Sequence, residues 1–142
     1  MVPEVSFSIW GERGVIDVVL WHPATRSLLL IELKTEIVDP GELLGTMDRR
    51  RRLAPEIVAG RGWDPLTVSA WIIVADSRTN QRRLRQLRTM LRSACPVDGR
   101  SIRAWLRDPK GSVAALSMWV VDRTAGGERL APTQRVRVAL RA

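Results

Sequence analysis

The chain of 142 residues is long enough for one domain with its own hydrophobic core and too short for two domains that each have a core of sufficient size. Its formal net charge of +8 indicates a polyanionic partner, because an excess of basic residues is the electrostatic footprint of nucleic-acid binders. The single cysteine excludes an internal disulfide, and no apolar run is long enough to span a membrane. We therefore expect residues 1–142 to form one soluble, cytoplasmic domain that binds nucleic acid and no membrane.

The first part of the chain has the pattern of three consecutive strands. Apolar residues alternate with polar ones or run without a break, and glycine- or proline-containing turns separate the segments. The run Leu28–Ile31 is typical of a strand that is buried on both faces. The sequence therefore predicts a three-strand antiparallel meander, with strands over 4–10, 15–21 and 27–34.

Charged residues interrupt two of these apolar strands. Side chains alternate along a strand, so Glu32 and Lys34 share one face while Leu33 points to the other. Asp17 is the one carboxylate within the preceding apolar strand. Buried charges are costly unless they are paired or hold a metal, so these three ionisable residues are expected to meet. The alternative is that Glu32 and Lys34 form a solvated pair and Asp17 faces water.

Asp17 followed by Glu32-Leu33-Lys34, with a hairpin between them, resembles the PD-(D/E)XK nuclease superfamily, which has the restriction-endonuclease-like fold. Ile16 stands where the superfamily's name has proline, a common departure. The resemblance implies that Asp17, Glu32 and the Leu33 carbonyl hold Mg²⁺ or Mn²⁺. It also implies that Lys34 lies against the scissile phosphate or the attacking water. A hard cation prefers such oxygen ligands, activates water and polarises the phosphoryl group.

The use of lysine supports a distinct role for Lys34. The chain has only two lysines, Lys34 and Lys110, against twenty-one arginines. A high-GC codon bias explains arginine in place of lysine, but it does not explain the excess of bases over acids. A compact ammonium differs chemically from a planar guanidinium, so lysine at this position indicates a specific requirement.

The rest of the chain has an alternating helix–strand pattern. Asp39 and Pro40 predict a helix start, and an apolar stripe continues to the glycines at 60–62, with a kink or a break at Pro55. A crossover through this helix predicts that the next strand is central and parallel to the third. The remaining expected elements are a strand over 66–75, a helix over 81–94, strands over 102–106 and 114–121, and a weakly alternating tail over 135–140.

The expected order of elements (strand, strand, strand, helix, strand, helix, strand) predicts an α/β domain of restriction-endonuclease-like architecture, with a central mixed sheet and helices on its faces. The superfamily core usually opens with a helix, whereas this chain starts almost at its first strand. We therefore expect the C-terminal segment or a second copy of the chain, as in a homodimer, to cover the exposed sheet face. The missing helix would also remove one acidic residue, unless Glu4, Glu12 or Glu36 substitutes for it.

Basic residues in the two expected helices are candidates for binding the nucleic-acid backbone. They gather in a run after Asp48 and along the second helix, whose expected span contains no acidic residue. The alternative is that these arginines lie on helix faces that only contact solvent. Basic patches increase affinity for nucleic acid but do not provide specificity for a base sequence. Trp63, in a glycine-rich loop, is the best candidate for stacking on a base. The arginines proposed to bind nucleic acid are Arg49, Arg50, Arg51, Arg52, Arg82, Arg85, Arg88 and Arg92.

Two hypotheses for function follow. The first is a Mg²⁺-dependent nuclease that hydrolyses phosphodiester bonds, with DNA as the expected substrate. The second is a catalytically inactive DNA-associated or oligomerising module of a transcriptional regulator. The segments around Asp17 and Glu32 also look like a group of uncharacterised bacterial proteins in which a helix-turn-helix segment precedes this domain, and this chain would be a shortened member.

Overall fold

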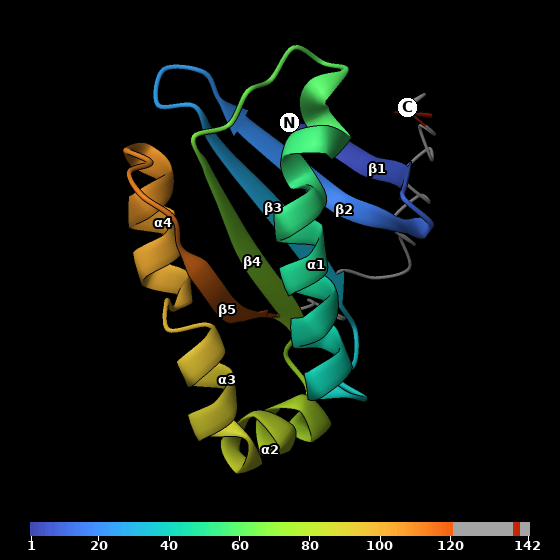
Figure 1. The fold of residues 1–142 in the computed structure, drawn as a ribbon. Coiled ribbons are helices and arrows are strands. Elements are labelled where there is room, and N and C mark those ends of the chain that lie inside the picture. Colours follow the sequence, from blue (N-terminus) through green and yellow to red (C-terminus); the bar gives the residue numbers. More distant parts are fainter. Residues whose placement is uncertain (121–137, 140–142) are drawn as a thin grey trace, which may run out of the picture.

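A mixed β-sheet with helices on both faces forms the protein, which is therefore of the α/β class (Figure 1). The computed structural model describes residues 1–120 and 138–139. The strands are β1 Val2–Ile9, β2 Glu12–His22, β3 Ser27–Lys34, β4 Thr67–Ala75, β5 Ala114–Trp119 and β6 Val138–Ala139. The helices are α1 Pro40–Ala59, α2 Arg78–Gln86, α3 Arg88–Ala94 and α4 Gly99–Arg107.

The strand order across the sheet is β5-β4-β3-β2-β1-β6. β1, β2 and β3 pair in antiparallel fashion, which confirms the expected meander. β4 pairs in parallel with β3 and with β5, so the crossover through α1 and the central position of β4 are also confirmed. β6 pairs in parallel with β1 at Val5 and Ser6. The rest of the tail expected over 135–140 lies outside the described residues.

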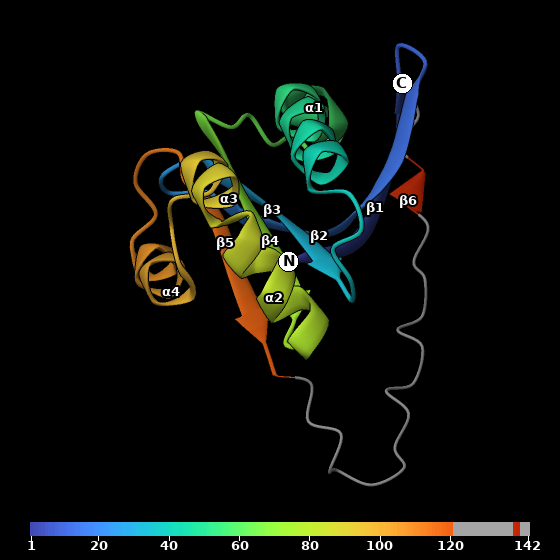
Figure 2. The same ribbon diagram turned by 90° about the horizontal axis from the view of Figure 1, so that it is seen from below.

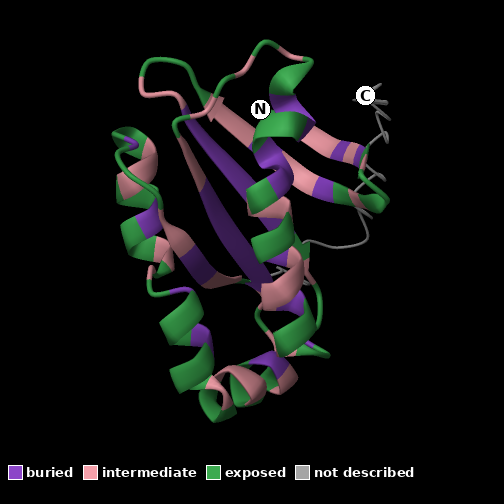
Figure 3. Cartoon of the chain, in the orientation of Figure 1, coloured by how far each residue is buried: buried purple, intermediate pink, exposed green. Residues whose placement is uncertain are grey.

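Two hydrophobic cores lie on opposite faces of the sheet. α1 covers the face that carries Leu28 and Leu30, and Leu91 of α3 joins the same core. α4 covers the other face through Ile102, which packs with Leu29 of β3. Figure 2 shows α1 and α4 on opposite faces, and Figure 3 shows that the buried residues concentrate along β3 and β4. The first six residues of β3 are buried, as expected for a strand covered on both faces.

The expected strand over 102–106 is wrong, because these residues belong to α4. The carboxylate of Asp98 accepts a hydrogen bond of 2.8 Å from the Ser101 amide and caps the helix. Ile102, Trp105 and Leu106 then lie on one side and pack in the second core. A short apolar run fits a strand or a helix equally well, and here the cap decides for the helix.

The expected helix over 81–94 is two helices. The Ser77 hydroxyl accepts a hydrogen bond from the Asn80 amide at 3.1 Å, so α2 begins earlier, at Arg78. Leu87 adopts a non-helical backbone conformation between α2 and α3, with φ −110° and ψ 17°. This break lets α3 turn its Leu91 into the core, while α2 lies beyond the end of β4 (Figure 1).

α1 begins at Pro40 with Asp39 as its cap, as expected, and runs through Pro55 as one helix. Of the kink or break expected at Pro55, the break into two helices is therefore wrong. Leu53, Ala54, Ile57 and Val58 are buried on both sides of the exposed proline, so packing holds the helix together where its hydrogen bonding is interrupted. Within the described part of the chain, no helix is both long and apolar enough to cross a membrane.

Candidate functional site

Glu32 is the centre of a charged cluster at the end of β3. Its side chain is only 7% exposed, and it pairs with two cations. The Lys34 ammonium lies 3.3 Å from Oε1, and the Arg50 guanidinium donates a 2.6 Å hydrogen bond to Oε2. A solvated surface pair of Glu32 and Lys34 is therefore excluded as the explanation of these charges.

Asp17 lies at an irregularity in β2. Cα pairing with β3 ends at Val18, and the register with β1 passes from Pro3↔Val18 to Val5↔Ile16 without a pair at Asp17. The strand changes the alternation of its faces here, because Ile16 and Val19 both pack in the α1-side core. In place of strand pairing, the Asp17 carboxylate accepts a hydrogen bond of 2.8 Å from the Leu33 amide. This bond fixes the carboxylate beside the Glu32 segment.

The electrostatics of the cluster act on Glu32. Burial raises the pKa of the Glu32 carboxyl above its ordinary value, and the negative charge of Asp17 raises it further. Arg50 and Lys34 lower this pKa, yet they do not cancel the effect of burial. Asp17 and Glu32 are thus electrostatically coupled neighbours, and an added cation would stabilise their ionised forms.

A cavity of about 370 Å³ opens between the end of β3, the loop that follows it and the first turns of α1. Four carboxylate residues and two cationic residues are among its lining groups. Several of these acids already have partners: Glu36 pairs with Arg83 at 3.1 Å, and Asp39 accepts from the Glu42 amide at 3.0 Å. The lining is Glu32, Lys34, Glu36, Ile37, Val38, Asp39, Glu42, Leu43, Thr46 and Arg50.

The three acids considered as additional ligands lie in different places. Glu36 lines the cavity and pairs with Arg83. Glu4 falls at the same gap in the β1–β2 register as Asp17 and has a positive φ of 47°. Glu12 starts β2 and lines a different cavity. Among the described residues, no group of three or more His, Cys, Asp or Glu side chains converges on one point.

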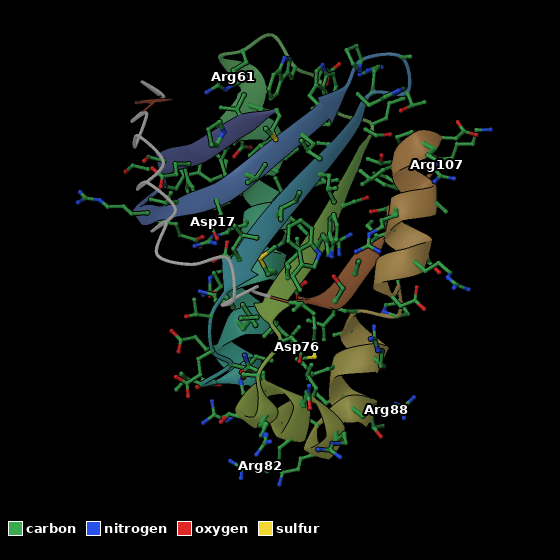
Figure 4. The ribbon with its side chains drawn as sticks, turned by 180° about the vertical axis from the view of Figure 1, so that it is seen from behind. Asp17, Arg61, Asp76, Arg82, Arg88 and Arg107 are labelled. Carbon is green, nitrogen blue, oxygen red and sulfur yellow. The ribbon has the colours of Figure 1, made fainter. Side chains whose placement is uncertain are left out.

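The arginines proposed to bind nucleic acid separate into three groups. Arg50 belongs to the Glu32 cluster. Arg51 and Arg92 bind backbone carbonyls of neighbouring strands and loops, at Val68 for Arg51 and at Cys95, Val97 and Leu116 for Arg92. Figure 4 shows Arg82 and Arg88 pointing outward from α2 and α3. The third group, whose members are exposed, is Arg49, Arg52, Arg82, Arg85 and Arg88.

Trp63 is engaged within the protein. Its ring stacks on Trp21 with centroids 5.7 Å apart and an interplanar angle of 12°. The guanidinium carbon of Arg61 lies 5.5 Å from the same ring. The ring packs at the edge of the α1-side core, so base stacking by Trp63 would have to disrupt contacts that stabilise the fold.

Two residues position the site in a way that the sequence did not predict: Asn80, and Arg50, which was expected only to bind nucleic acid. Asn80 is fully buried; it accepts from the Ile37 amide and donates to the carbonyls of Thr35 and Ala75, so it fixes the loop that lines the cavity. Arg50 is the cation that reaches Glu32, and its spacing from the apolar residues of α1 indicates that it faces the sheet. It occupies the apolar stripe that continues through Met47, Ala54 and Ile57, the face that α1 turns toward the sheet.

The donor set fits a magnesium ion only with help from solvent and substrate. Mg²⁺ keeps several waters and needs one or two carboxylates, which Asp17 and Glu32 supply. Leu33 places its amide on Asp17, while its side chain is 50% exposed on the opposite face from Glu32. Both carboxylates already accept hydrogen bonds within the protein, so an ion would compete with Lys34 and Arg50 for Glu32.

Comparisons with protein-family models, with curated proteins and with solved structures give no match for this chain. The assignment of function therefore depends on the geometry of the site.

Proposed function

We propose that this protein is a magnesium-dependent phosphodiesterase that hydrolyses nucleic acid, with DNA as its substrate, and that it has the restriction-endonuclease-like fold. One observation carries the proposal: the hydrogen bond from the Leu33 amide to Asp17 puts the Asp17 carboxylate beside the Glu32–Lys34 pair. Two carboxylates and a lysine on adjacent strands are what the resemblance to the PD-(D/E)XK superfamily requires.

The arrangement of strands supports the proposed fold. An antiparallel meander of β1, β2 and β3 leads through α1 to the parallel strand β4, which is the order of the superfamily core after its opening helix. The motif residues occupy β2 and the end of β3, as the resemblance implies. Asp17 leaves the regular strand pairing at that place, and functional residues often lie at such irregularities.

Each residue of the cluster has a separate role in the proposed reaction. Bound Mg²⁺ would supply Lewis-acid polarisation of the phosphoryl group and a more acidic water. Asp17 and Glu32 would hold it, and the burial of Glu32 strengthens its attraction for a cation. The side chain of Lys34 is 40% exposed, so its ammonium can leave Glu32 and stabilise the developing negative charge of the phosphate.

A plasmid-nicking assay tests the proposal, with supercoiled DNA in Mg²⁺ or Mn²⁺ and with EDTA as a blank. We expect nicking by the wild type and a loss of about 100-fold in Lys34→Ala, the usual cost of removing one electrostatic stabiliser of a transition state. Lys110→Ala is the matched control, because Lys110 is exposed and its one ion pair among the described residues is with Asp108, at 3.0 Å. Equal nicking by all three proteins would show a contaminating nuclease and would refute the proposed role of Lys34.

A second candidate function is supported by the ion pair between Arg50 and Glu32. Both oxygens of Glu32 have cationic partners, and the two acids Asp17 and Glu32 are balanced by two bases. A cluster whose charges are already balanced attracts a metal ion less strongly, as expected for an inactive DNA-associated or oligomerising module. This function predicts salt-sensitive DNA binding that survives Asp17→Ala and no nicking in either metal. Nicking that depends on Lys34 would exclude it.

A further inference from the structure

A second cavity, of about 300 Å³, lies between the start of β2 and α1. Three of its lining residues are arginines and one is acidic, the reverse of the balance in the first cavity. Thr46 and Arg50 line both cavities. The two cavities are thus neighbours, one with mainly acidic walls and one with mainly basic walls. The lining of the second cavity is Phe7, Glu12, Arg13, Thr46, Arg49 and Arg50.

The guanidinium of Arg50 extends between the two cavities. Its Nη1 donates to Glu32, whereas its Nη2 lies 3.3 Å from the point where a side chain on Gly14 would begin. The same point is 3.0 Å from two ring carbons of Phe7, so the absence of a side chain at Gly14 leaves room for both groups. A planar guanidinium presents donors on both sides, so Arg50 can bind Glu32 and an anion in the second cavity at once or exchange one for the other.

Arg13 and Arg49 have uncompensated charges. Among the described residues neither forms an ion pair, whereas Arg26, Arg50 and Arg83 each pair with a carboxylate. In the part of the chain that the structure describes, the side chain of Arg49 forms one hydrogen bond, to the Thr46 hydroxyl of its own helix, at 3.2 Å. Both side chains are exposed and line the cavity that Arg50 enters. Guanidinium groups that converge without a carboxylate partner are the usual means of binding phosphate.

We propose that this second cavity binds a phosphate of the nucleic-acid backbone, through Arg13, Arg49 and Arg50, and that this phosphate neighbours the scissile one at Lys34. Binding of this phosphate draws Arg50 away from Glu32 and frees one oxygen of that carboxylate for the metal. The substrate thereby prepares the metal site, and by linkage the metal tightens binding of the substrate. This inference rests on the proposed function for the identity of its two ligands, nucleic acid and metal. Binding to the basic cavity can nevertheless be measured without metal and without cleavage.

Anisotropy of a labelled DNA duplex, measured in EDTA, tests the subsite directly. We expect Arg13→Gln with Arg49→Gln to weaken binding roughly tenfold and to lower the slope of log K against log salt by about one. The matched control is Arg103→Gln with Arg107→Gln, which removes the same charge from exposed positions of α4 on the opposite face of the sheet (Figure 4). Equal weakening by both double variants would mean that only net charge matters, and it would overturn the proposal.

The coupling through Arg50 has its own test. Calorimetric titration with Mg²⁺ is compared in dimethyl phosphate, a mimic of the backbone phosphodiester, and in sodium chloride at equal ionic strength. We expect about fivefold tighter Mg²⁺ binding in dimethyl phosphate, the low end of typical coupling between sites, and no difference in the Arg13→Gln, Arg49→Gln variant. Equal Mg²⁺ affinity in both solutions would overturn the coupling.

Two further outcomes distinguish a subsite for the DNA backbone from a site for free phosphate and from the nuclease activity itself. An effect of inorganic phosphate on Mg²⁺ binding, with unchanged DNA affinity in the Arg13→Gln, Arg49→Gln variant, would assign the cavity to free phosphate and overturn the backbone assignment. Failure of the nicking assay with a selective loss of DNA binding in that variant would refute the nuclease and support the subsite. The two proposals therefore fail in different experiments.

Discussion

Arg50 donates a 2.6 Å hydrogen bond to Oε2 of Glu32, and this contact joins the middle of α1 to the end of β3 across the sheet face. The side chain of Arg50 is 13% exposed and that of Glu32 is 7% exposed, so the pair is shielded from solvent. In this position Arg50 stabilises an otherwise costly buried carboxylate, and it also occupies an oxygen that a metal would need.

Arg50→Gln should therefore have two opposite effects. The variant should lose about 2 kcal/mol of unfolding free energy, because Glu32 loses a charge-assisted hydrogen bond and remains buried. It should also bind Mg²⁺ about fivefold more tightly, since a cationic competitor is removed. Urea denaturation and calorimetry measure the two effects. Arg52→Gln, at an exposed position of the same helix, is the control and should change neither by much. Weaker Mg²⁺ binding in Arg50→Gln would contradict the competition.

The raised pKa of Glu32 gives a prediction for stability against pH in metal-free buffer. Below the ordinary pKa of 4.5, Glu32 is protonated in both the folded and the unfolded protein, so its ionisation does not affect the free energy of unfolding. As pH rises from there through the raised pKa of the folded state, the unfolded chain releases a proton that the folded protein retains, so stability falls. Wild type should therefore lose stability over this window relative to Glu32→Gln, as urea midpoints at several pH values will show.

A direct readout avoids dependence on the folding of the Glu32→Gln variant. Carboxyl carbon NMR on the wild type should show a Glu32 signal that titrates above the ordinary glutamate range, and Glu32→Gln or Glu32→Asp should identify this signal. The physical cause is burial, with a smaller contribution from Asp17. A titration of Glu32 below the ordinary glutamate range would mean that Arg50 and Lys34 outweigh desolvation, and it would contradict this prediction.

The placement of Asp17, Glu32 and Lys34 could be predicted because alternation along strands is a local property. An apolar run that ends in Glu-Leu-Lys fixes which side chains share a face, and a short hairpin brings the previous strand alongside. The sequence did not predict the irregularity that takes Asp17 out of the regular pairing. That feature depends on the joint register of β1, β2 and β3, which no single segment encodes.

The sequence predictions failed where tertiary packing decides between local structures that the sequence alone allows equally well. The segment around Trp105 forms a helix because the cap at Asp98 and the second core favour it, and its apolar residues alone suit a strand as well. Arg50 was one of four consecutive arginines in the sequence. Which of them reaches Glu32 depends on how α1 is rotated against the sheet, and only the apolar stripe around Met47 and Ala54 indicates that rotation.

Cys95 is expected to be unreactive in the folded protein. It is 5% exposed, and burial raises its pKa above the ordinary value, so the nucleophilic thiolate is scarce near neutral pH. Ellman's reagent should label the native protein slowly and label it fully in urea. The rate should follow the unfolding curve, because the thiol becomes accessible when the α1-side core opens. Rapid labelling of the native protein would show that α3 opens locally.

Asn80→Ala should loosen the loop that lines the first cavity. The side-chain oxygen of Asn80 accepts from the Ile37 amide at 3.1 Å, and its nitrogen donates to the Thr35 and Ala75 carbonyls at 3.0 and 2.9 Å. Removing the amide leaves buried backbone groups without partners, so we expect a loss of about 3 kcal/mol in urea denaturation.

Hydrogen exchange distinguishes this local effect from general destabilisation. In Asn80→Ala the Ile37 amide should exchange much faster than amides of β4, because it loses its acceptor while the sheet remains intact. Gln81→Ala is the control, since Gln81 is an exposed neighbour on the same helix and its side chain bonds, within the described residues, to Asp76 alone, at 2.6 Å. That substitution should change stability by less than about 0.5 kcal/mol. Uniform acceleration of exchange throughout the sheet in Asn80→Ala would show that Asn80 supports the whole fold and has no special connection to the loop beside Glu32.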